Sequence, residues 1–318
     1  MSQATQRKRK LARGAISTLV GVMLLAGSAR ANEIDPWTFA YAGLDHFYNV
    51  EYEEAIADFE SAIARDPRNP VFYNFLANIY LFQELKHLGQ LDGNLYDASN
   101  SFLKAEKPKP DPNQMAKIKN TLAKARALCK ARLREDPRDA DALYALGASY
   151  GIEANYKFTI ERSWFQALRA GSKANDLHEK VLKIDPGYHD AKLIPGLYQY
   201  VVGSIPRGIK WFAFMIGYRG SKEKGIRLLQ EAMQGGKIVT SDAATLLALI
   251  YSREKDFNYA RTLLGALIEY YPRNALLRLE YGRTYSRERK GKEALEVYAA
   301  VARDMEAGRP GYDKLPRA

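Results

Sequence analysis

The sequence predicts an all-α fold in which antiparallel helix pairs stack into a right-handed superhelical solenoid. The first observation is a proline that recurs at the end of amphipathic runs, because proline ends a helix. These prolines are Pro67, Pro137, Pro186 and Pro272. The second observation is a small residue ten positions after each proline. The four small residues are Ala77, Gly147, Gly196 and Gly282. A motif that returns at a fixed spacing is typical of repeat architectures, in which each repeat packs on its neighbours.

The motif within one repeat is clearest near the N-terminus. Gly43 is followed at offsets of 12, 16, 19 and 24 by Ala55, Phe59, Ala62 and Pro67. The same offsets recur from Ala248, and most of them recur from Gly282. Small residues let two antiparallel helices approach closely, and the large apolar residue fills the gap between them. This pattern resembles the tetratricopeptide repeat (TPR), and the resemblance covers most of the chain after residue 31 and implies a TPR solenoid.

The repeat boundaries follow from the positions of the motif. They are expected near 36–69, 70–139, 140–188, 189–240, 241–274 and 275–308, with a C-terminal tail at 309–318. The three middle repeats are longer than the others, and their extra residues fall between the two helices of each pair. We therefore expect lengthened helices there, with protrusions at 83–118, 152–170 and 200–222. A long helix from about Asn113 to Glu135 should follow the Pro- and Lys-rich stretch in the first of these.

The first 31 residues have the layout of a secretory signal peptide. A basic cluster from Arg7 to Arg13 precedes an apolar run from Gly14 to Gly27, and Ala29-Arg30-Ala31 is a cleavage pattern. The run is shorter than the ~20 residues that span a bilayer as a helix. The sequence thus predicts cleavage after Ala31 and an exported protein of the periplasm or cell envelope.

The net charge of +11 does not by itself indicate a nucleic-acid partner. Residues 1–31 hold six basic residues and no acid, and the rest of the chain holds 42 basic and 37 acidic residues. A mildly basic exported protein needs no nucleic acid, although it can favour anionic surfaces. The partners predicted from the sequence are therefore a protein or peptide and possible contact with a membrane surface, without nucleic acid.

An apolar segment at 205–218 stands out in the middle of the chain. It is rich in aromatic residues, with Arg207 before its centre and Arg219 after it. One interpretation is a helix buried between repeats, since hydrophobic helices of large proteins usually lie in the core. The other is a lip that contacts a membrane or an apolar ligand. Its central residues are Ile209, Trp211, Phe212, Phe214 and Met215. The surrounding stretch, 195–235, is similar to a segment of a eukaryotic group of TPR proteins linked to outer-membrane or inclusion-body clearance.

The sequence contains no recognisable catalytic, metal or cofactor motif. None of its four histidines stands at a metal-ligand spacing such as H-E-x-x-H, and no nucleophile elbow or phosphate loop is present. His46 and His178 occupy motif positions that TPR proteins fill with packing residues. Cys129 falls on an apolar helix face and is expected to be buried. We therefore expect no enzymatic activity, no cofactor and no metal.

A binding site is expected on the first helix of each pair, because the resemblance to TPR proteins implies that these helices line a concave groove. Asn74 and Asn78 lie four residues apart on one face and suit hydrogen bonding to a peptide backbone. Three arginines could form a cationic end for an acidic partner, or a solvated surface. The full set of groove candidates is Phe47, Tyr48, Asn74, Asn78, Tyr144, Arg253, Arg283 and Arg287. The leading hypothesis is a protein-interaction scaffold, and the alternative is a peripheral membrane or lipid-binding protein that uses 205–218.

Overall fold

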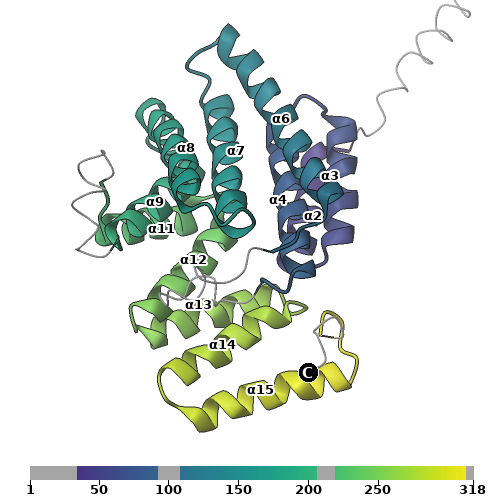
Figure 1. Cartoon of the computed structure of the whole chain (residues 1–318), viewed down its shortest axis with the longest axis vertical. Coiled ribbons are helices and arrows are strands. Elements are labelled where there is room, and N and C mark those ends of the chain that lie inside the picture. Colours follow the sequence, from purple (N-terminus) through teal and green to yellow (C-terminus); the bar gives the residue numbers. More distant parts are fainter. Residues whose placement is uncertain (1–33, 92–107, 206–218, 313–318) are drawn as a thin grey trace, which may run out of the picture.

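The computed structural model describes residues 34–91, 108–205 and 219–312. In these ranges every regular element is a helix, and the helices form six antiparallel pairs (Figure 1). The pairs are α2 (Pro36–Tyr48) with α3 (Tyr52–Arg65), α4 (Pro70–His87) with α6 (Pro112–Glu135), α7 (Ala140–Thr159) with α8 (Trp164–Ile184), α9 (Leu193–Gly203) with α11 (Lys222–Gly235), α12 (Thr240–Arg253) with α13 (Phe257–Tyr270), and α14 (Ala275–Arg287) with α15 (Gly291–Glu306). The predicted all-α solenoid is confirmed.

Three helices begin at an acidic or amide residue followed by proline. Asp35, Asn69 and Asp111 each accept a hydrogen bond from the backbone N–H two residues later, at 3.1, 3.1 and 2.9 Å. The proline after each cap needs no hydrogen-bond acceptor in the first turn and has a backbone angle suited to a helix. The sequence therefore specifies where α2, α4 and α6 start.

The small residue of the motif lies where the two helices of a pair cross. A β-carbon added at Gly43 would lie 2.7 Å from the ring of Phe59, and one at Gly196 would lie 2.9 Å from Leu229. At Gly147 the contact is with the ring of His178, which is fully buried. The predicted pairing of a small residue with a large one is confirmed at these three crossings, and it explains why these pairs are tight.

Lengthened helices are present in the second and third pairs, but the prediction is wrong for the fourth pair, in which α9 has 11 residues and α11 has 14. α4 and α6 have 18 and 24 residues, and α7 and α8 have 20 and 21, whereas α2 has 13 and α3 has 14. The long helix predicted from about Asn113 is α6, and Cys129 is buried on it. Most of the predicted protrusion at 152–170 is helix, since α7 runs on to Thr159 and α8 starts at Trp164. Residues 92–107 of the first predicted protrusion lie outside the described ranges.

The same limit applies to three other predictions. The signal peptide at 1–31 and the central residues of the apolar segment lie outside the described residues, as does the end of the C-terminal tail. Those central residues are Ile209, Trp211, Phe212, Phe214 and Met215.

The array curves so that first helices lie on its inner side. α4 packs against α7 and α9 against α12, which are first helices of adjacent pairs. The pairs follow an arc from α2 and α3 to α14 and α15 (Figure 1). Separate buried clusters run along this arc, one centred on the first two pairs and another on α9 to α14. The inner, concave face is therefore the place to examine the predicted groove residues.

Candidate interaction site on the concave face

The two predicted amide residues of the groove have different surroundings. Asn74 on α4 is buried, and its side chain donates a 2.7 Å hydrogen bond to the carbonyl of Ala145 on α7. The hydroxyl of Ser149 donates to the Asn74 carbonyl oxygen at 2.5 Å. Both ends of the Asn74 amide thus join α4 to α7. Asn78, one turn further along α4, is half-buried and lies nearer the solvent.

Tyr144 on α7 is packed inside the array. Its ring lies 5.2 Å from that of Tyr188 and 5.1 Å from that of His178, measured between centroids. Burial raises the pKa of the Tyr144 hydroxyl, and the carboxylate of Asp190 adds to the effect. Burial lowers the pKa of His178 to about 4, although the carbonyls of Ala191 and Tyr144 face its ring nitrogens. His178 is therefore a neutral core histidine, consistent with its motif position.

Phe47 and Tyr48 lie at the end of α2. Phe47 is buried, with its ring 5.3 Å from that of Phe82. Tyr48 faces the far end of the array, and its ring lies 5.0 Å from that of Tyr271. Burial raises the pKa of the Tyr48 hydroxyl, and the carboxylate of Asp242 on α12 raises it further. Burial also raises the pKa of Asp242 to about 6, while its interaction with Tyr48 acts in the opposite direction.

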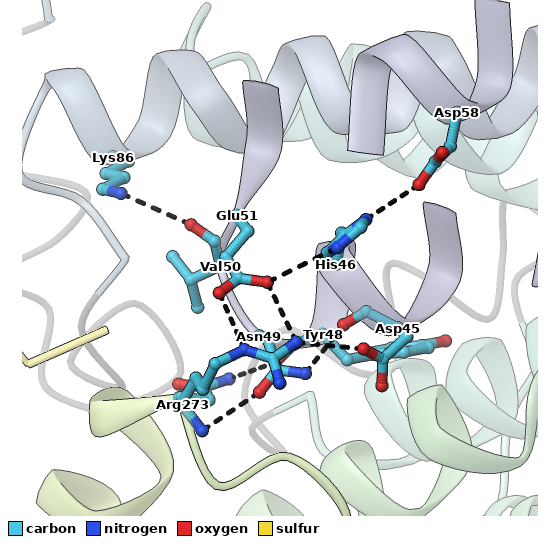
Figure 2. A network of polar contacts seen from close by, with 10 residues as sticks. Asp45, His46, Tyr48, Asn49, Val50, Glu51, Asp58, Lys86 and Arg273 are labelled. Atoms are coloured by element: carbon cyan, nitrogen blue, oxygen red, sulfur yellow. Dashed lines mark hydrogen bonds and ion pairs between the residues drawn. The ribbon is translucent and has the colours of Figure 1, made fainter. Parts of the chain in front are cut away.

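The first repeat thus contacts the fifth, and a polar network surrounds this contact (Figure 2). We call the contact between residues 45–51 and residues 271–274 the seam. Its centre is Arg273, whose guanidinium binds Glu51 at 2.8 and 3.0 Å and Asp45 at 3.0 Å. A planar guanidinium that meets one carboxylate with two parallel bonds is a strong and directional ion pair. The bond to Glu51 is the main reason that the pKa of Arg273 is raised.

Two asparagines complete the seam. Asn49 is buried, accepts the backbone N–H of Arg273 at 3.1 Å, and donates to the carbonyl of Asp45 at 3.0 Å. Asn274 donates to the carbonyl of Tyr48 at 2.7 Å, and its side-chain oxygen caps α14 through the N–H of Leu276. The seam therefore fixes the start of α14 against the end of α2.

The backbone of the first turn is strained at the seam. Val50 has φ of 64°, in the left-handed region that β-branched residues avoid. Lys255 and Arg289, at the equivalent positions of the last two repeats, share this conformation. Such strain persists where surrounding contacts hold the backbone. In all three turns the next residue closes the turn: the N–H of Glu51 donates to the carbonyl of His46, that of Asp256 to Tyr251 and that of Lys290 to Tyr285, each at 2.9 Å.

The start of the C-terminal tail supports the other side of the seam. Tyr312 is fully buried, and the guanidinium groups of Arg278 and Arg309 lie 5.6 and 5.0 Å from the centre of its ring. Gly311 has φ of 84° and lies against the carbonyl of Arg273, so a side chain there would clash. The turn at 271–274 is thus held between the first repeat and the tail.

The predicted cationic end lies beyond the seam. Arg253 is exposed, near the ring of Tyr200 at 5.9 Å. Arg283 and Arg287 are half-buried and lie 3.3 and 3.9 Å from the buried carboxylate of Glu280. Arg287 also donates to the hydroxyl of Ser252 at 3.0 Å, which joins α14 to α12. Of the three arginines, Arg253 is the most accessible.

Hollows on the surface lie elsewhere. Two of them, of about 340 and 400 Å³, follow the space between the second helices α3 and α6. In the described part of the chain no cluster of three His, Cys, Asp or Glu residues could hold a metal ion. No helix of that part has the length and apolar character needed to cross a membrane.

Sequence reasoning misses the seam. The Pro272-Arg273-Asn274 tripeptide indicates only the end of a second helix, and no motif singles out Glu51. A signal is available in Asn49, because a polar side chain beside a β-branched residue in a helix–helix turn suits a hydrogen-bonded contact. The identity of the distant partner, however, depends on how far the array curves.

Comparison with known proteins gives similarity in fold. Neither a protein-family model nor a curated protein sequence matches the chain. The TPR protein TTC0263 of Thermus thermophilus is 16% identical with a TM-score of 0.42, over 78% of this chain and 98% of that one. A crystal structure of MamA is 20% identical with a TM-score of 0.41, over 62% and 96%. Yeast Tom70 is 14% identical with a TM-score of 0.33, over 83% and 75%.

The architecture is that of a TPR solenoid. This assignment rests on the chain itself: stacked antiparallel helix pairs, first helices on the inner side, and a small residue against a large one at the helix crossings. Arrays of this kind are protein-interaction scaffolds in general, because the stacked pairs present one extended curved surface.

Proposed function

We propose that the chain is a non-enzymatic scaffold that holds a polypeptide partner on its concave face, in the periplasm or cell envelope. Support for a binding role comes from the curvature, which places the first helices of successive pairs on one inner surface. Side chains of several pairs meet there, as Asn74 does with Ser149 and Tyr48 with Tyr271. An extended polypeptide can contact many repeats at once on such a surface.

The observation that carries the proposal is the difference in exposure between the two ends of this surface. Its N-terminal part is closed by Tyr48 and the seam, while its C-terminal end has Arg253 exposed on α12 and Arg283 half-buried on α14. A guanidinium with free donors recognises carboxylates well. A partner with an acidic region is therefore expected to contact the C-terminal end first. The location in the envelope rests on the signal-peptide layout of residues 1–31.

The test is a crosslinking capture from the envelope fraction with the full chain. We expect a defined protein to be captured by the wild type and lost with Arg253→Glu/Arg283→Glu. The matched control is Arg289→Glu/Arg303→Glu, which reverses two exposed arginines away from the first-helix surface and should retain the partner. Equal capture by both double variants would contradict the proposed site.

A vesicle-binding experiment tests the alternative function, which is lipid binding. The wild type and Trp211→Asp are mixed with vesicles that contain anionic phospholipid and are then sedimented. Retention that is lost with Trp211→Asp, together with no captured protein, would replace the scaffold by a lipid-binding protein that uses 205–218. Indifference to vesicles would leave the scaffold as the function.

A further inference from the structure

The seam shows the chemistry that the turn at 271–274 accepts. Arg273 presents its guanidinium and its backbone N–H on the same side, and Asn274 presents a side-chain amide beside them. All three donate hydrogen bonds to one segment, residues 45–51, which supplies two carboxylates, one amide oxygen and one carbonyl. The aromatic ring of Tyr271 adds an apolar contact with Tyr48. This is a donor-rich surface that suits an acidic segment with an aromatic residue.

We propose that the turn at 271–274 is a docking site for an acidic segment of a polypeptide partner, and that residues 45–51 occupy it in the free protein as an internal ligand. The inference rests on the proposed scaffold function, since it names the chemistry of the partner and the step that admits it. It places recognition on a turn between two repeats, next to the inner surface that the partner would then follow.

The seam has the properties of a contact that can be exchanged. It joins two turns and is made mainly of polar groups, while the buried cluster of the first two repeats is separate from that of α9 to α14. Asp45 and Arg273 keep side-chain exposures of 52% and 35%, so water and ligands reach the ion pair.

A partner segment must displace residues 45–51 before it can bind Arg273. Residues 45–51 are tethered to the same chain, so their effective concentration at Arg273 is about millimolar or higher, and a free segment competes poorly unless it gains other contacts. The inner surface beside the seam offers such contacts to a longer partner. An isolated acidic peptide should therefore bind well only when the internal ligand is removed.

The experiment opens the seam from either side by like-charge repulsion. Asp45→Lys/Glu51→Lys repels Arg273 but keeps its guanidinium as a donor to carboxylates, whereas Arg273→Glu repels Asp45 and Glu51 and removes that donor. The triple variant Asp45→Lys/Glu51→Lys/Arg273→Glu inverts the ion pair and should close the seam again. Opening is measured between spin labels at Glu54→Cys and Glu269→Cys, both exposed, in a chain whose own Cys129 is buried.

Binding is then measured with a fluorescent peptide of the chain's own residues 44–52, by anisotropy. We expect Asp45→Lys/Glu51→Lys to bind it at least about tenfold more tightly than the wild type, because the tethered competitor is gone. Arg273→Glu, although open, should not bind it, and neither should the triple variant. Arg68→Glu, in the identical tripeptide of the first repeat, should match the wild type.

Three outcomes would overturn the inference: equal binding by Arg273→Glu and Asp45→Lys/Glu51→Lys, no binding by the latter, or label distances that do not respond to the variants. Far-ultraviolet circular dichroism checks that each variant keeps its helices. Failure here leaves the scaffold proposal intact if the envelope capture still depends on Arg253 and Arg283. Conversely, if the peptide binds but no envelope protein is captured, the docking site stands while the proposed function in the envelope fails.

Discussion

The same tripeptide, Pro-Arg-Asn, ends the second helix of the first repeat and of the fifth. In both copies the asparagine caps the next helix: Asn69 accepts the N–H of Val71 at 3.1 Å, and Asn274 accepts that of Leu276 at 3.0 Å. The arginines differ. Arg68 is exposed, while Arg273 binds Glu51 and Asp45 in the seam.

This difference teaches that local structure and interaction are set at different levels. The tripeptide makes the same turn twice because proline stops one helix and asparagine starts the next. Only the second copy meets another part of the chain, because the curvature of the array brings the first repeat to it. Four predictions follow, and three of them compare matched positions in different repeats.

The largest effect is expected at the two arginines. Arg273→Ala should lower the free energy of unfolding by about 2–3 kcal/mol, because the partly buried carboxylate of Glu51 loses both bonds of its ion pair and Asp45 loses a third. Arg68→Ala should change it by less than about 0.5 kcal/mol, as is usual for an exposed residue. Urea denaturation followed by circular dichroism measures both. Equal losses would mean that the seam adds no stability.

The two asparagines should differ by one hydrogen bond. Asn69→Ala removes a helix cap at a cost of about 1 kcal/mol. Asn274→Ala removes a cap and also the 2.7 Å bond to the carbonyl of Tyr48, so its cost should be about 1 kcal/mol larger. The difference between the two losses in urea denaturation, combined in a double-mutant cycle with Arg273→Ala, reports the coupling within the seam.

The pH dependence of the free energy of unfolding should report on Asp242, which interacts with Tyr48 beside the seam. Asp242 has its pKa raised to about 6 by burial, so its folded form binds a proton more readily than its unfolded form, and its contribution to stability is present at low pH and lost as pH rises through 6. His178, with its pKa lowered to about 4, acts in the opposite direction, since it loses stability as pH falls. Comparison of wild type with Asp242→Asn cancels the histidine.

The stability advantage of Asp242→Asn over wild type should therefore shrink by about 1 kcal/mol between pH 7.5 and pH 5. The measurement is urea denaturation of both proteins at the two pH values. An advantage that stays constant would show that Asp242 titrates as it does in the unfolded chain.

The smallest effect is expected at the strained turn. Val50→Gly should stabilise the protein by about 0.5–1 kcal/mol, because glycine adopts positive φ freely while a β-branched residue does not. Arg289→Gly, at the equivalent turn of the last repeat, should gain only about a few tenths of a kcal/mol, since an unbranched side chain is less strained and glycine costs entropy in the unfolded chain. Thermal unfolding measures both. A loss at Val50 would argue against the strain.

Much of the fold could be predicted from the sequence, because helix starts, helix ends and helix crossings depend on neighbouring residues. Asn69 and Pro70 specify the start of α4, and Gly43 needs only Phe59, sixteen residues away, to form its crossing. The groove candidates follow the same local logic. The structure describes Asn74 and Tyr144 as buried within the array and Arg253 as exposed, a difference that motif phase cannot express.

By itself, the sequence determined the all-α repeat architecture and the lengthened helices of the second and third pairs, and it placed His178 at a packing position of the motif. The tertiary structure alone decided that Arg273 meets Glu51, which lies 222 positions away along the chain. The physical reason is accumulation. Each helix pair adds a small rotation to the array, and the sum over several pairs determines whether the ends meet. A motif that specifies one crossing at a time does not contain that sum.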